Sequence, residues 1–354
     1  MGLTLEDMGG WRGVLAHVAA GDHLSSEQAA AALGDVLEGN ATPAQIAAFM
    51  FGLRCRGETV EEMTGMVEAM LAASERVELP AGLSERVVDT CGTGGDRSGT
   101  INVSTIAALV VAGAGVPVCK HGGRAASSQA GSADVLEALG VVIDLGPRGV
   151  ARCVVEAGIG FCFAPRYHPA MRHAIPIRRE LGVPTAFNFL GPLANPARVR
   201  RQVVGVGDPA MAAKMAGVLV AGGADRVMVV HGAGGLDELS TTGPSTVHSY
   251  RDGRLAESVV DPAALGLAPA AIADLRGGDA STNARLARAV LAGEAGPQRD
   301  IVLLNAAAGL VVGGACDDLV SGLDLAAAAV DDGRAAVCLE KLVAVSTAAR
   351  AAGD

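Results

Sequence analysis

The sequence has few aromatic residues and no cysteine pattern typical of a metal site or a disulfide framework. Phe, Trp and Tyr make up 3% of its 354 residues, with one tryptophan, so we expect no stacking platform for nucleic-acid bases. The seven cysteines are odd in number and form no C-x-x-C pair, which indicates reduced thiols in a cytosolic protein. No histidine or cysteine cluster has zinc spacing, and no Gly-x-Ser-x-Gly elbow occurs, which argues against a structural zinc site and an elbow-type serine hydrolase.

Positive charge and long apolar runs are also scarce. The chain has 38 acidic and 28 basic residues, a net charge of -10, which disfavours binding to nucleic acid or to an anionic membrane. Its longest apolar stretch, Ile106 to Val118, is too short and too broken by glycine to span a bilayer, and the N-terminus has no signal pattern. We therefore expect a cytoplasmic protein that meets any anionic ligand with local basic groups or a metal.

What the sequence does have is length, and half of its residues are hydrophobic. This predicts two domains, or one large domain with a helical appendage. The first 75 residues have the pattern of amphipathic helices, with Thr42 and Pro43 starting one helix and a capping box of Thr59 and Glu62 starting another. A break at 78–82 precedes the first strand.

Short apolar runs then alternate with helical patterns, which predicts a mostly parallel sheet flanked by helices. The runs 247–250 and 255–260 resemble a hairpin, and the C-terminal part returns to alanine-rich helices. The predicted strands are 86–89, 116–120, 141–143, 159–163, 203–206 and 226–231, and the helices between them are 132–139, 148–157 and 209–221.

Ligands of such sheets bind at the carboxyl ends of the strands, and four of the loops there are unusual. The first runs from Asp89 to Asp96 and is followed by Asn102 to Thr105. Its glycines and the start of a helix suit a phosphate. Asp96 would repel a bare phosphate, so it indicates an intervening cation or ribose hydroxyls. The alternative is a glycine-rich turn with Ser104 as the helix N-cap.

Two other loops carry charge. Residues 120–128 combine Lys120, His121 and Arg124 with two glycines and two serines, donors that suit phosphate or pyrophosphate oxygens; a solvated basic loop is the alternative. After the strand at 226–231, the adjacent Asp237 and Glu238 on a glycine-rich turn suit Mg²⁺ that keeps several waters. The alternative there is a solvated acidic pair.

The remaining loop, residues 164–193, mixes prolines, an aromatic residue and adjacent arginines, which is typical of a segment that crosses between domains and lines a cleft. Arg178 or Arg179 could clamp a carboxylate, or could make an interdomain salt bridge. The four loops offer no obvious nucleophile or strong base. That favours a reaction in which magnesium-bound pyrophosphate leaves and charge stabilisation carries the rate.

These motifs, in this order, resemble the anthranilate phosphoribosyltransferases of tryptophan biosynthesis over nearly the whole chain. The resemblance implies a homodimer with a small helical domain at 1–80, which receives a returning contribution from about 172–198. It implies an α/β domain at 81–171 and 199–354, related in fold to pyrimidine nucleoside phosphorylases. The matching segments are 92–96, 102–105, 120–122, 131–134, 178–192 with 195–196, and 235–238.

The resemblance also implies that the phosphoribosyl group of phosphoribosyl pyrophosphate passes to the amine of anthranilate, with inversion and with Mg²⁺ as cofactor. Because this aryl amine is neutral at pH 7, no strong base is needed. The donor would be held by Gly92, Gly95, Asp96, Thr100, Asn102, Val103, Ser104, Thr105, Lys120, Arg124, Ser127, Ser128 and Ser132, the acceptor by Gly92, His121, Gly123, Ala164, Pro165, Met171 and Arg178, and magnesium by Ser104, Asp237 and Glu238.

One position departs from the family. The family motif is Lys-His-Gly-Asn-Arg, and this chain has Gly123 in place of the asparagine. In the family, that asparagine contacts the acceptor near the acceptor's amino group. Losing one neutral hydrogen bond costs about 0.5–1.5 kcal/mol, which weakens anthranilate use without abolishing it. Either a water replaces the amide, or the pocket accepts a different aromatic or amine acceptor.

Two further alternatives have less support from the sequence. A pyrimidine nucleoside phosphorylase fits Arg178 and the Asp237–Glu238 pair less well than an enzyme with a magnesium-pyrophosphate donor. A noncatalytic homologue that binds nucleic acid is opposed by the acidic net charge and by the complete donor motifs.

Overall fold

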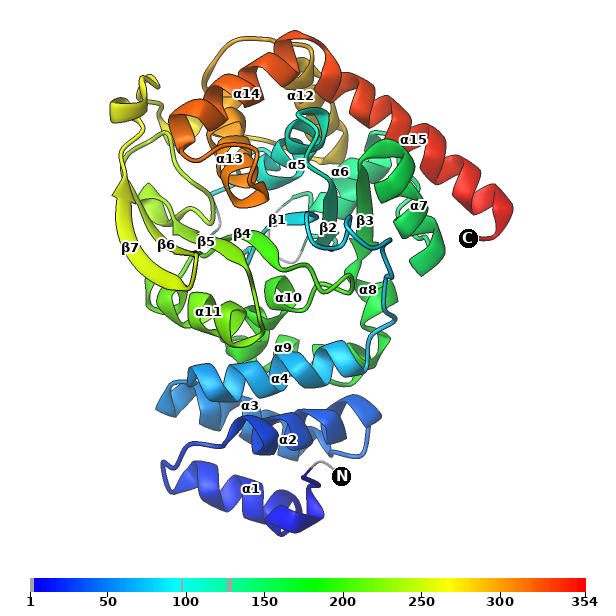
Figure 1. Cartoon of the computed structure of the whole chain (residues 1–354). Coiled ribbons are helices and arrows are strands. Elements are labelled where there is room, and N and C mark those ends of the chain that lie inside the picture. Colours follow the sequence, from blue (N-terminus) through cyan, green and yellow to red (C-terminus); the bar gives the residue numbers. More distant parts are fainter. Residues whose placement is uncertain (1–2, 97, 126–128) are drawn as a thin grey trace.

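The computed structural model describes residues 3–96, 98–125 and 129–354, so the predicted donor residues Ser127 and Ser128 lie outside the described residues. The N-terminal helices form one end of the molecule, and a sheet with helices on its faces forms the rest (Figure 1). None of the helices in the described ranges combines the length and the apolar character needed to cross a membrane.

The N-terminal helices begin at the predicted signals. The hydroxyl of Thr42 accepts a hydrogen bond from Gln45 N at the start of α3, and Thr59 forms a capping box with Glu62 at the start of α4. Both capping predictions are confirmed, because each box depends on residues only three positions apart. The helices are α1 (Gly10–Ala19), α2 (Ser26–Glu38), α3 (Pro43–Arg56) and α4 (Val60–Ala72).

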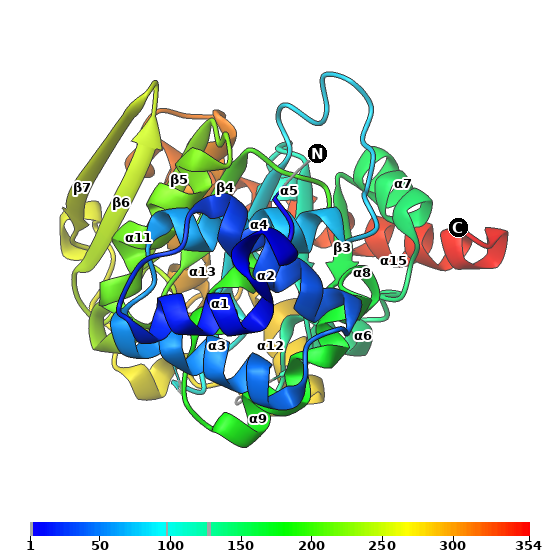
Figure 2. The ribbon, with the colours of Figure 1, turned by 90° about the horizontal axis from the view of Figure 1, so that it is seen from below.

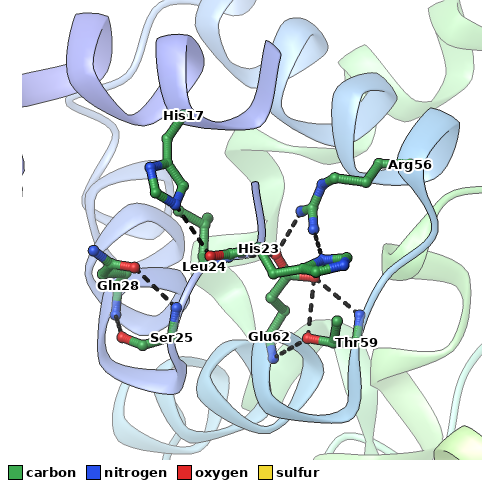
Figure 3. A network of polar contacts seen from close by, with 8 residues as sticks. All are labelled: His17, His23, Leu24, Ser25, Gln28, Arg56, Thr59 and Glu62. Carbon is green, nitrogen blue, oxygen red and sulfur yellow. Dashed lines mark hydrogen bonds and ion pairs between the residues drawn. The ribbon is translucent and has the colours of Figure 1, made fainter. Parts of the chain in front are cut away.

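A buried carboxylate ties these helices together (Figure 3). The side chain of Glu62 is fully buried and accepts backbone hydrogen bonds from Leu24 N at 2.8 Å and Thr59 N at 2.9 Å. It also forms an ion pair with the guanidinium of Arg56, beside which lies the ring of His23. Glu62 therefore joins the turn before α2, the end of α3 and the start of α4.

The predicted mostly parallel sheet is confirmed, with the strand order β3-β2-β1-β4-β5-β6-β7. Strands β1 to β5 pair in parallel, and the predicted hairpin adds β6 and β7 in antiparallel pairing. The strands are β1 (Val88–Gly92), β2 (Val118–Gly122), β3 (Ile159–Phe163), β4 (Arg201–Gly205), β5 (Arg226–His231), β6 (Ser245–Arg251) and β7 (Arg254–Val260).

The strand predicted at 141–143 is wrong. Val141 and Ile143 are buried as expected, but the segment between α6 and α7 pairs with no strand of the sheet. Instead, Val142 N donates a hydrogen bond to Ser346 Oγ at 3.1 Å, on α15 (Arg334–Ala352). A short apolar run shows that a segment is buried, but not which partner covers it.

The two faces of the sheet belong to different hydrophobic cores. Adjacent residues of β4 point to opposite faces: Val203 joins a core with the C-terminal helices, and Val204 joins a core with the N-terminal helices and residues 171–194. The helices of the larger part are α5 (Val103–Gly113), α6 (Ser132–Ala138), α7 (Pro147–Ala157), α8 (Ala164–Tyr167), α9 (Ile175–Leu181), α10 (Leu190–Leu193), α11 (Pro209–Ala221), α12 (Ala280–Leu291), α13 (Pro297–Gly313), α14 (Leu319–Asp331) and α15.

Candidate active site

The loop after β1 has a backbone that glycine alone adopts readily. Gly94, Gly95 and Gly99 have φ angles of 67°, 82° and 66°, in the left-handed region where a Cβ is disfavoured. Within this loop, the carboxylate of Asp96 accepts hydrogen bonds from Ser98 N at 3.2 Å and Ser98 Oγ at 2.7 Å. The loop therefore holds Asp96 against its own backbone at the end of β1.

The helix that follows starts two residues earlier than it would if Ser104 were its N-cap. Asn102 is the N-cap residue of α5, without a side-chain cap bond, so that alternative is wrong. The amide of Asn102 instead donates to Ala130 O at 3.0 Å and accepts from Asn283 Nδ2 at 2.8 Å. Its side chain joins the start of α5 to two other segments.

Two more of the predicted donor residues face the protein interior. The side chains of Val103 and Thr105 are buried in the first turn of α5, which leaves only their backbone near its N-terminus. Thr100 forms an isolated antiparallel bridge with Arg276, and its hydroxyl lies 3.2 Å from Ser98 Oγ. The first N–H groups of α5 are already engaged, since Val103 N donates to Ile101 O at 2.8 Å and Thr105 N to Asn102 O at 3.1 Å. What this end of α5 presents is the positive end of its helix dipole, which favours an anion such as phosphate.

Two carboxylates reach this helix start from the turn after β5. Asp237 Oδ2 accepts a hydrogen bond from Gly94 N at 2.7 Å, and Glu238 Oε1 accepts one from Ser104 N at 3.0 Å. The structure therefore brings the first predicted loop and the predicted metal pair together, although they are more than 130 residues apart in the sequence.

The segment around Asp237 crosses the ends of β1 and β4 in very close contact. A Cβ at Gly92 would lie 2.3 Å from Asp237 Oδ2, and a Cβ at Gly205 would lie 1.5 Å from Asp237 O. Two residues further on, Leu239 is held in place because its N donates to Asn305 Oδ1 and its O accepts from Asn305 Nδ2, both at 2.9 Å. Glycine at these strand ends is what allows Asp237 to reach the loop.

Both carboxylates resist ionisation. Burial raises the pKa of Asp237 to about 7, and the nearby charge of Asp96 adds to the effect. Burial and then the charge of Asp237 raise the pKa of Glu238 to about 8, against the opposing effect of Lys120. Two half-buried carboxyl groups that share a site hold protons at neutral pH unless a cation replaces them.

This donor set fits Mg²⁺ that brings other ligands with it. No three His, Cys, Asp or Glu side chains of the described residues are grouped as metal ligands, so the protein alone offers no complete cage. Asp237 and Glu238 each accept a backbone bond and keep acceptor capacity on their carboxylate oxygens. Magnesium commonly takes one or two carboxylates and completes its shell with waters and substrate phosphates.

A buried cation lies beneath the same helix start. Lys120 is 2% exposed, and its Nζ contacts Thr90 O and lies 3.4 Å from Ser104 Oγ. The hydroxyl of Thr90 donates to Ser104 O at 3.0 Å. Lys120 therefore connects β1, β2 and α5 and places a positive charge under the loop.

The arginine of the second predicted loop, Arg124, binds two carboxylates of α6. Arg124 Nη1 contacts Asp134 Oδ1 at 2.7 Å and Glu137 Oε2 at 3.0 Å. The hydroxyl of Ser132 donates to Gly123 O at 3.2 Å. Arg124 and Ser132 thus shape the loop and are not free in this structure. Among the described residues, the nearest atom to a Cβ added at Gly123 would be Ala164 Cβ at 3.9 Å, so these residues leave space there.

His121 presents a neutral acceptor. Its Nδ1 lies 3.1 Å from Gly191 O, a carbonyl that can only accept, so Nδ1 carries the proton and Nε2 does not. Nε2 is buried and has no partner among the described residues. Burial, together with the neighbouring ring of His168 at 5.1 Å, lowers the pKa of His121 to about 3, so the ring stays neutral near pH 7.

Arg178, on α9, is a cation without a partner. Neither a hydrogen bond nor an ion pair joins its side chain to any residue in the described ranges, and burial lowers the pKa of its guanidinium. Its neighbour Arg179 is exposed. Met171 is buried in the core shared with the N-terminal helices, and Ala164 and Pro165 start α8 just after β3. The predicted interdomain salt bridge at Arg178 is not formed.

Sequence reasoning missed a buried polar network behind the site. Asp89 Oδ2 accepts from Asn195 Nδ2 at 2.8 Å and Asp89 Oδ1 from His121 N at 3.2 Å, while Gln202 Nε2 lies 3.4 Å away. Asn195 lies in one of the matching segments, Asp89 starts the first of the four loops, and Gln202 is a polar residue inside an apolar strand. These positions were the available signal. Asn283 gives a similar signal, as a lone amide on an alanine-rich helix.

Comparison with known proteins defines the class. Residues 84–336 match the model of the glycosyl transferase family a/b domain, and residues 12–74 match its helical bundle domain. The anthranilate phosphoribosyltransferase of Salinispora arenicola is 54% identical over 345 residues, covering 96% of this chain and 98% of that protein. That of Saccharopolyspora erythraea is 52% identical, covering 96% and 97%.

Solved structures agree. The crystal structure of anthranilate phosphoribosyltransferase from Thermus thermophilus has a TM-score of 0.89 and 42% identity, covering 94% of this chain and 99% of that one. The Saccharomyces cerevisiae enzyme in complex with phosphoribosyl pyrophosphate and Mg has a TM-score of 0.85 and 28% identity, covering 96% and 98%. This chain belongs to the anthranilate phosphoribosyltransferase family.

Proposed function

We propose that this protein transfers the phosphoribosyl group of phosphoribosyl pyrophosphate to the amine of anthranilate, giving N-(5'-phosphoribosyl)anthranilate and pyrophosphate. The observation that carries this proposal is the meeting of the Gly94 loop, the start of α5 and the Asp237–Glu238 turn at one edge of the sheet. Identity above 50% over nearly the whole chain to enzymes of that name supports it.

On the donor side, the backbone of the glycine loop and the N-terminus of α5 would bind phosphate oxygens. Lys120 supplies a fixed positive charge from beneath, and Asp96 stands where the ribose hydroxyls would lie. Asp237 and Glu238, with Ser104, would hold Mg²⁺. When bound, the cation neutralises the negative charge that the departing pyrophosphate accumulates.

On the acceptor side, Arg178 is the group we assign to the anthranilate carboxylate, because its guanidinium has no partner among the residues that the structure describes and a carboxylate matches its donors. The bare Nε2 of His121 would accept a hydrogen bond from the anthranilate amine. With a pKa of about 3, this imidazole is too weakly basic to remove a proton ahead of bond formation. His121 therefore orients the amine.

The reaction breaks the bond between the anomeric carbon and pyrophosphate and forms a bond from that carbon to nitrogen. The pyrophosphate leaves with the electron pair, positive charge develops on the ribose, and the amine attacks from the opposite face. Once the new bond has formed, the nitrogen is positively charged and strongly acidic. It then loses its extra proton to water. No protein nucleophile is required.

The domain division belongs to the same proposal. Residues 1–80 with about 172–198 would form the helical domain, and 81–171 with 199–354 the α/β domain. The core that Phe187 and Leu190 share with the N-terminal helices supports this division. We also propose that the enzyme works in the cytoplasm as a homodimer, and sedimentation velocity of the purified chain tests the dimer.

The direct test is to incubate the protein with Mg²⁺, phosphoribosyl pyrophosphate and anthranilate and to follow the loss of anthranilate fluorescence. We expect turnover that stops when either substrate or Mg²⁺ is omitted. The absence of turnover at millimolar anthranilate, with a protein that is folded by circular dichroism, contradicts the proposal. A panel of aminobenzoates measured alongside shows whether Gly123 has changed the preferred acceptor.

A further inference from the structure

A polar cavity lies at the amino ends of the strands, whereas the candidate active site lies at their carboxyl ends. It measures about 490 Å³ and is bounded by the amino ends of β4 and β5, the end of α11 and the turn between β6 and β7. In Figure 2 this turn and α9 lie on opposite sides of the molecule. Its charged and aromatic lining consists of Arg200, Arg201, Asp225, Arg226, Tyr250 and Asp252.

The two carboxylates of this lining already have partners. Asp225 Oδ1 is 2.7 Å from Arg200 Nη2, and Asp252 Oδ2 is 3.3 Å from Arg251 Nε. Arg200 is further held because its Nε donates to Gly223 O at 2.8 Å. Within the described residues, neither carboxylate forms an ion pair with the two arginines that remain, although the charge of Asp225 offsets part of the repulsion at Arg201.

Those two arginines are Arg201 and Arg226. Arg226 makes neither a hydrogen bond nor an ion pair through its side chain within the described part of the chain. Arg201 Nε is buried and lacks a hydrogen-bond partner among the same residues. A buried guanidinium N–H without an acceptor is costly, and native structures seldom leave one in that state.

The two guanidinium groups also lie near the same point of the backbone. A Cβ at Gly314 would stand 3.1 Å from Arg226 Nη1 and 3.4 Å from Arg201 Nη1, so both cations border the same point. Burial and then the charge of Arg226 lower the pKa of Arg201. Adjacent like charges destabilise each other unless an anion lies between them.

The end of α13 explains only part of this arrangement. Arg201 Nη1 donates to Gly313 O at 2.7 Å, and a cation at a helix C-terminus is favourable by about 0.3–1 kcal/mol. That contact uses one of the five N–H donors of Arg201. It satisfies neither Arg201 Nε nor any donor of Arg226.

We infer that this cavity binds the phosphate group of a small metabolite between Arg201 and Arg226. A phosphate monoester carries close to two negative charges at pH 7, which matches two unpaired guanidinium groups better than one carboxylate does. Guanidinium groups bind phosphate through paired N–H donors. The volume lies within the range of about 300–1,000 Å³ that small-molecule sites occupy, which leaves room beside Tyr250 for the rest of the molecule.

The test is isothermal titration calorimetry on the full chain without phosphoribosyl pyrophosphate, because that molecule carries a phosphate monoester and would compete for the cavity. The binding that Arg226→Gln weakens is assigned to the cavity. Inorganic phosphate and ribose 5-phosphate are titrated separately. We expect both to bind the wild type, and Arg226→Gln to raise the Kd at least tenfold, about 1.4 kcal/mol. Arg350→Gln, which removes the same charge from an exposed position on α15, should leave the Kd unchanged.

Arg201→Gln should raise the Kd as well, and melting by circular dichroism shows whether this variant still folds without its bond to Gly313. Tighter binding of ribose 5-phosphate than of phosphate supports a site for an organic phosphate, and equal binding supports one for the free anion. The proposal is overturned if neither probe binds the wild type at 10 mM, on the order of a weak metabolite affinity, or if binding survives unchanged in Arg226→Gln. Because Arg226 lies outside the proposed catalytic site, that failure leaves the transferase proposal intact.

Discussion

Glu62 is a fully buried carboxylate, and Asp237 and Glu238 are a half-buried pair in another part of the molecule. The two sites differ in how fully the carboxylate oxygens are satisfied. Glu62 has an arginine and several N–H or hydroxyl donors around it. Asp237 accepts one backbone N–H from Gly94 and Glu238 accepts one from Ser104. Burial raises the pKa of both, with the charge of Asp96 adding to the effect at Asp237 and the charge of Asp237 adding to it at Glu238.

This difference indicates that Glu62 stabilises the fold, whereas Asp237 and Glu238 have the character of ligand-binding groups. A saturated buried carboxylate has nothing left to offer, whereas an undersatisfied one gains when a cation arrives. The same reasoning separates Arg124, engaged by Asp134 and Glu137, from Arg178, which has no protein partner in the described residues.

The largest effect is expected from Glu62→Gln. This change removes the charge that faces Arg56 and leaves a buried cation unpaired, which costs about 3–5 kcal/mol. Urea denaturation should show the loss, while kcat and KM of the remaining folded protein should change less than about twofold. Glu27→Gln, at an exposed position of α2, is the control. A stability equal to that of the wild type would mean that the Glu62 network is not structural.

Asp237→Asn should have the opposite profile. The amide can still accept from Gly94 N, but its weaker hold on Mg²⁺ should lower kcat/KM about a hundredfold, or roughly 2.7 kcal/mol. Because the folded protein favours the neutral form of this carboxyl, the melting temperature without metal should stay the same or rise. Asp324→Asn, exposed on α14, should change neither. A lower melting temperature with intact activity would reverse the comparison with Glu62.

Arg178→Ala should raise the KM for anthranilate about tenfold to a hundredfold, because a charge-assisted hydrogen bond contributes about 1.5–3 kcal/mol. The KM for phosphoribosyl pyrophosphate should hardly change. The matched variant is Arg179→Ala, which removes the exposed neighbour. Steady-state kinetics with each substrate varied in turn measures both KM values in each variant. A raised KM for anthranilate in Arg179→Ala alone would show that Arg179, and not Arg178, binds the carboxylate.

The affinity for Mg²⁺ should rise with pH. The raised pKa values of about 7 and 8 mean that protons occupy the pair below these values and must leave when the metal binds. We expect about a tenfold gain per pH unit for each proton displaced between pH 6 and 8, and a shallower slope in Asp237→Asn. The same protons make the metal-free protein less stable as pH rises through this window, since the folded state binds more of them than the unfolded state. Calorimetric titration of Mg²⁺ and melting curves measure both trends, and a flat affinity would contradict the assignment.

The smallest effect is expected from Gly123→Asn. The open space at Gly123 admits a side chain, and one added neutral hydrogen bond contributes about 0.5–1.5 kcal/mol. The KM for anthranilate should therefore fall about threefold to tenfold. If the ranking of a panel of aminobenzoates stays the same, Gly123 only weakens binding; a changed ranking would identify it as a specificity determinant.

Local signals made much of the fold predictable. The capping boxes at Thr42 and Thr59, the hairpin and the alternation of strands and helices depend on residues close in sequence. The strand prediction for 141–143 was wrong because this segment contacts α15, where Val142 N bonds Ser346. No local sequence pattern indicates that contact.

The candidate site was predictable as a set of motifs, but the work of each side chain was not. Residue types indicated which loops face a ligand, since glycines and charges cluster there. They did not indicate that the Asn102 side chain binds Ala130 and Asn283, because both partners lie on other segments of the chain. Asp89 is a similar case: its carboxylate binds Asn195 and the backbone of His121 behind the site.

The crowding at Gly92 and Gly205 sets limits on how this enzyme can diverge. Any side chain at either position would displace Asp237, so sequence change there would damage the donor half of the site. Gly123 has no such neighbour. Under the proposed assignment of donor and acceptor residues, new acceptor preferences can therefore arise by mutation at Gly123 while Gly92 and Gly205 stay fixed.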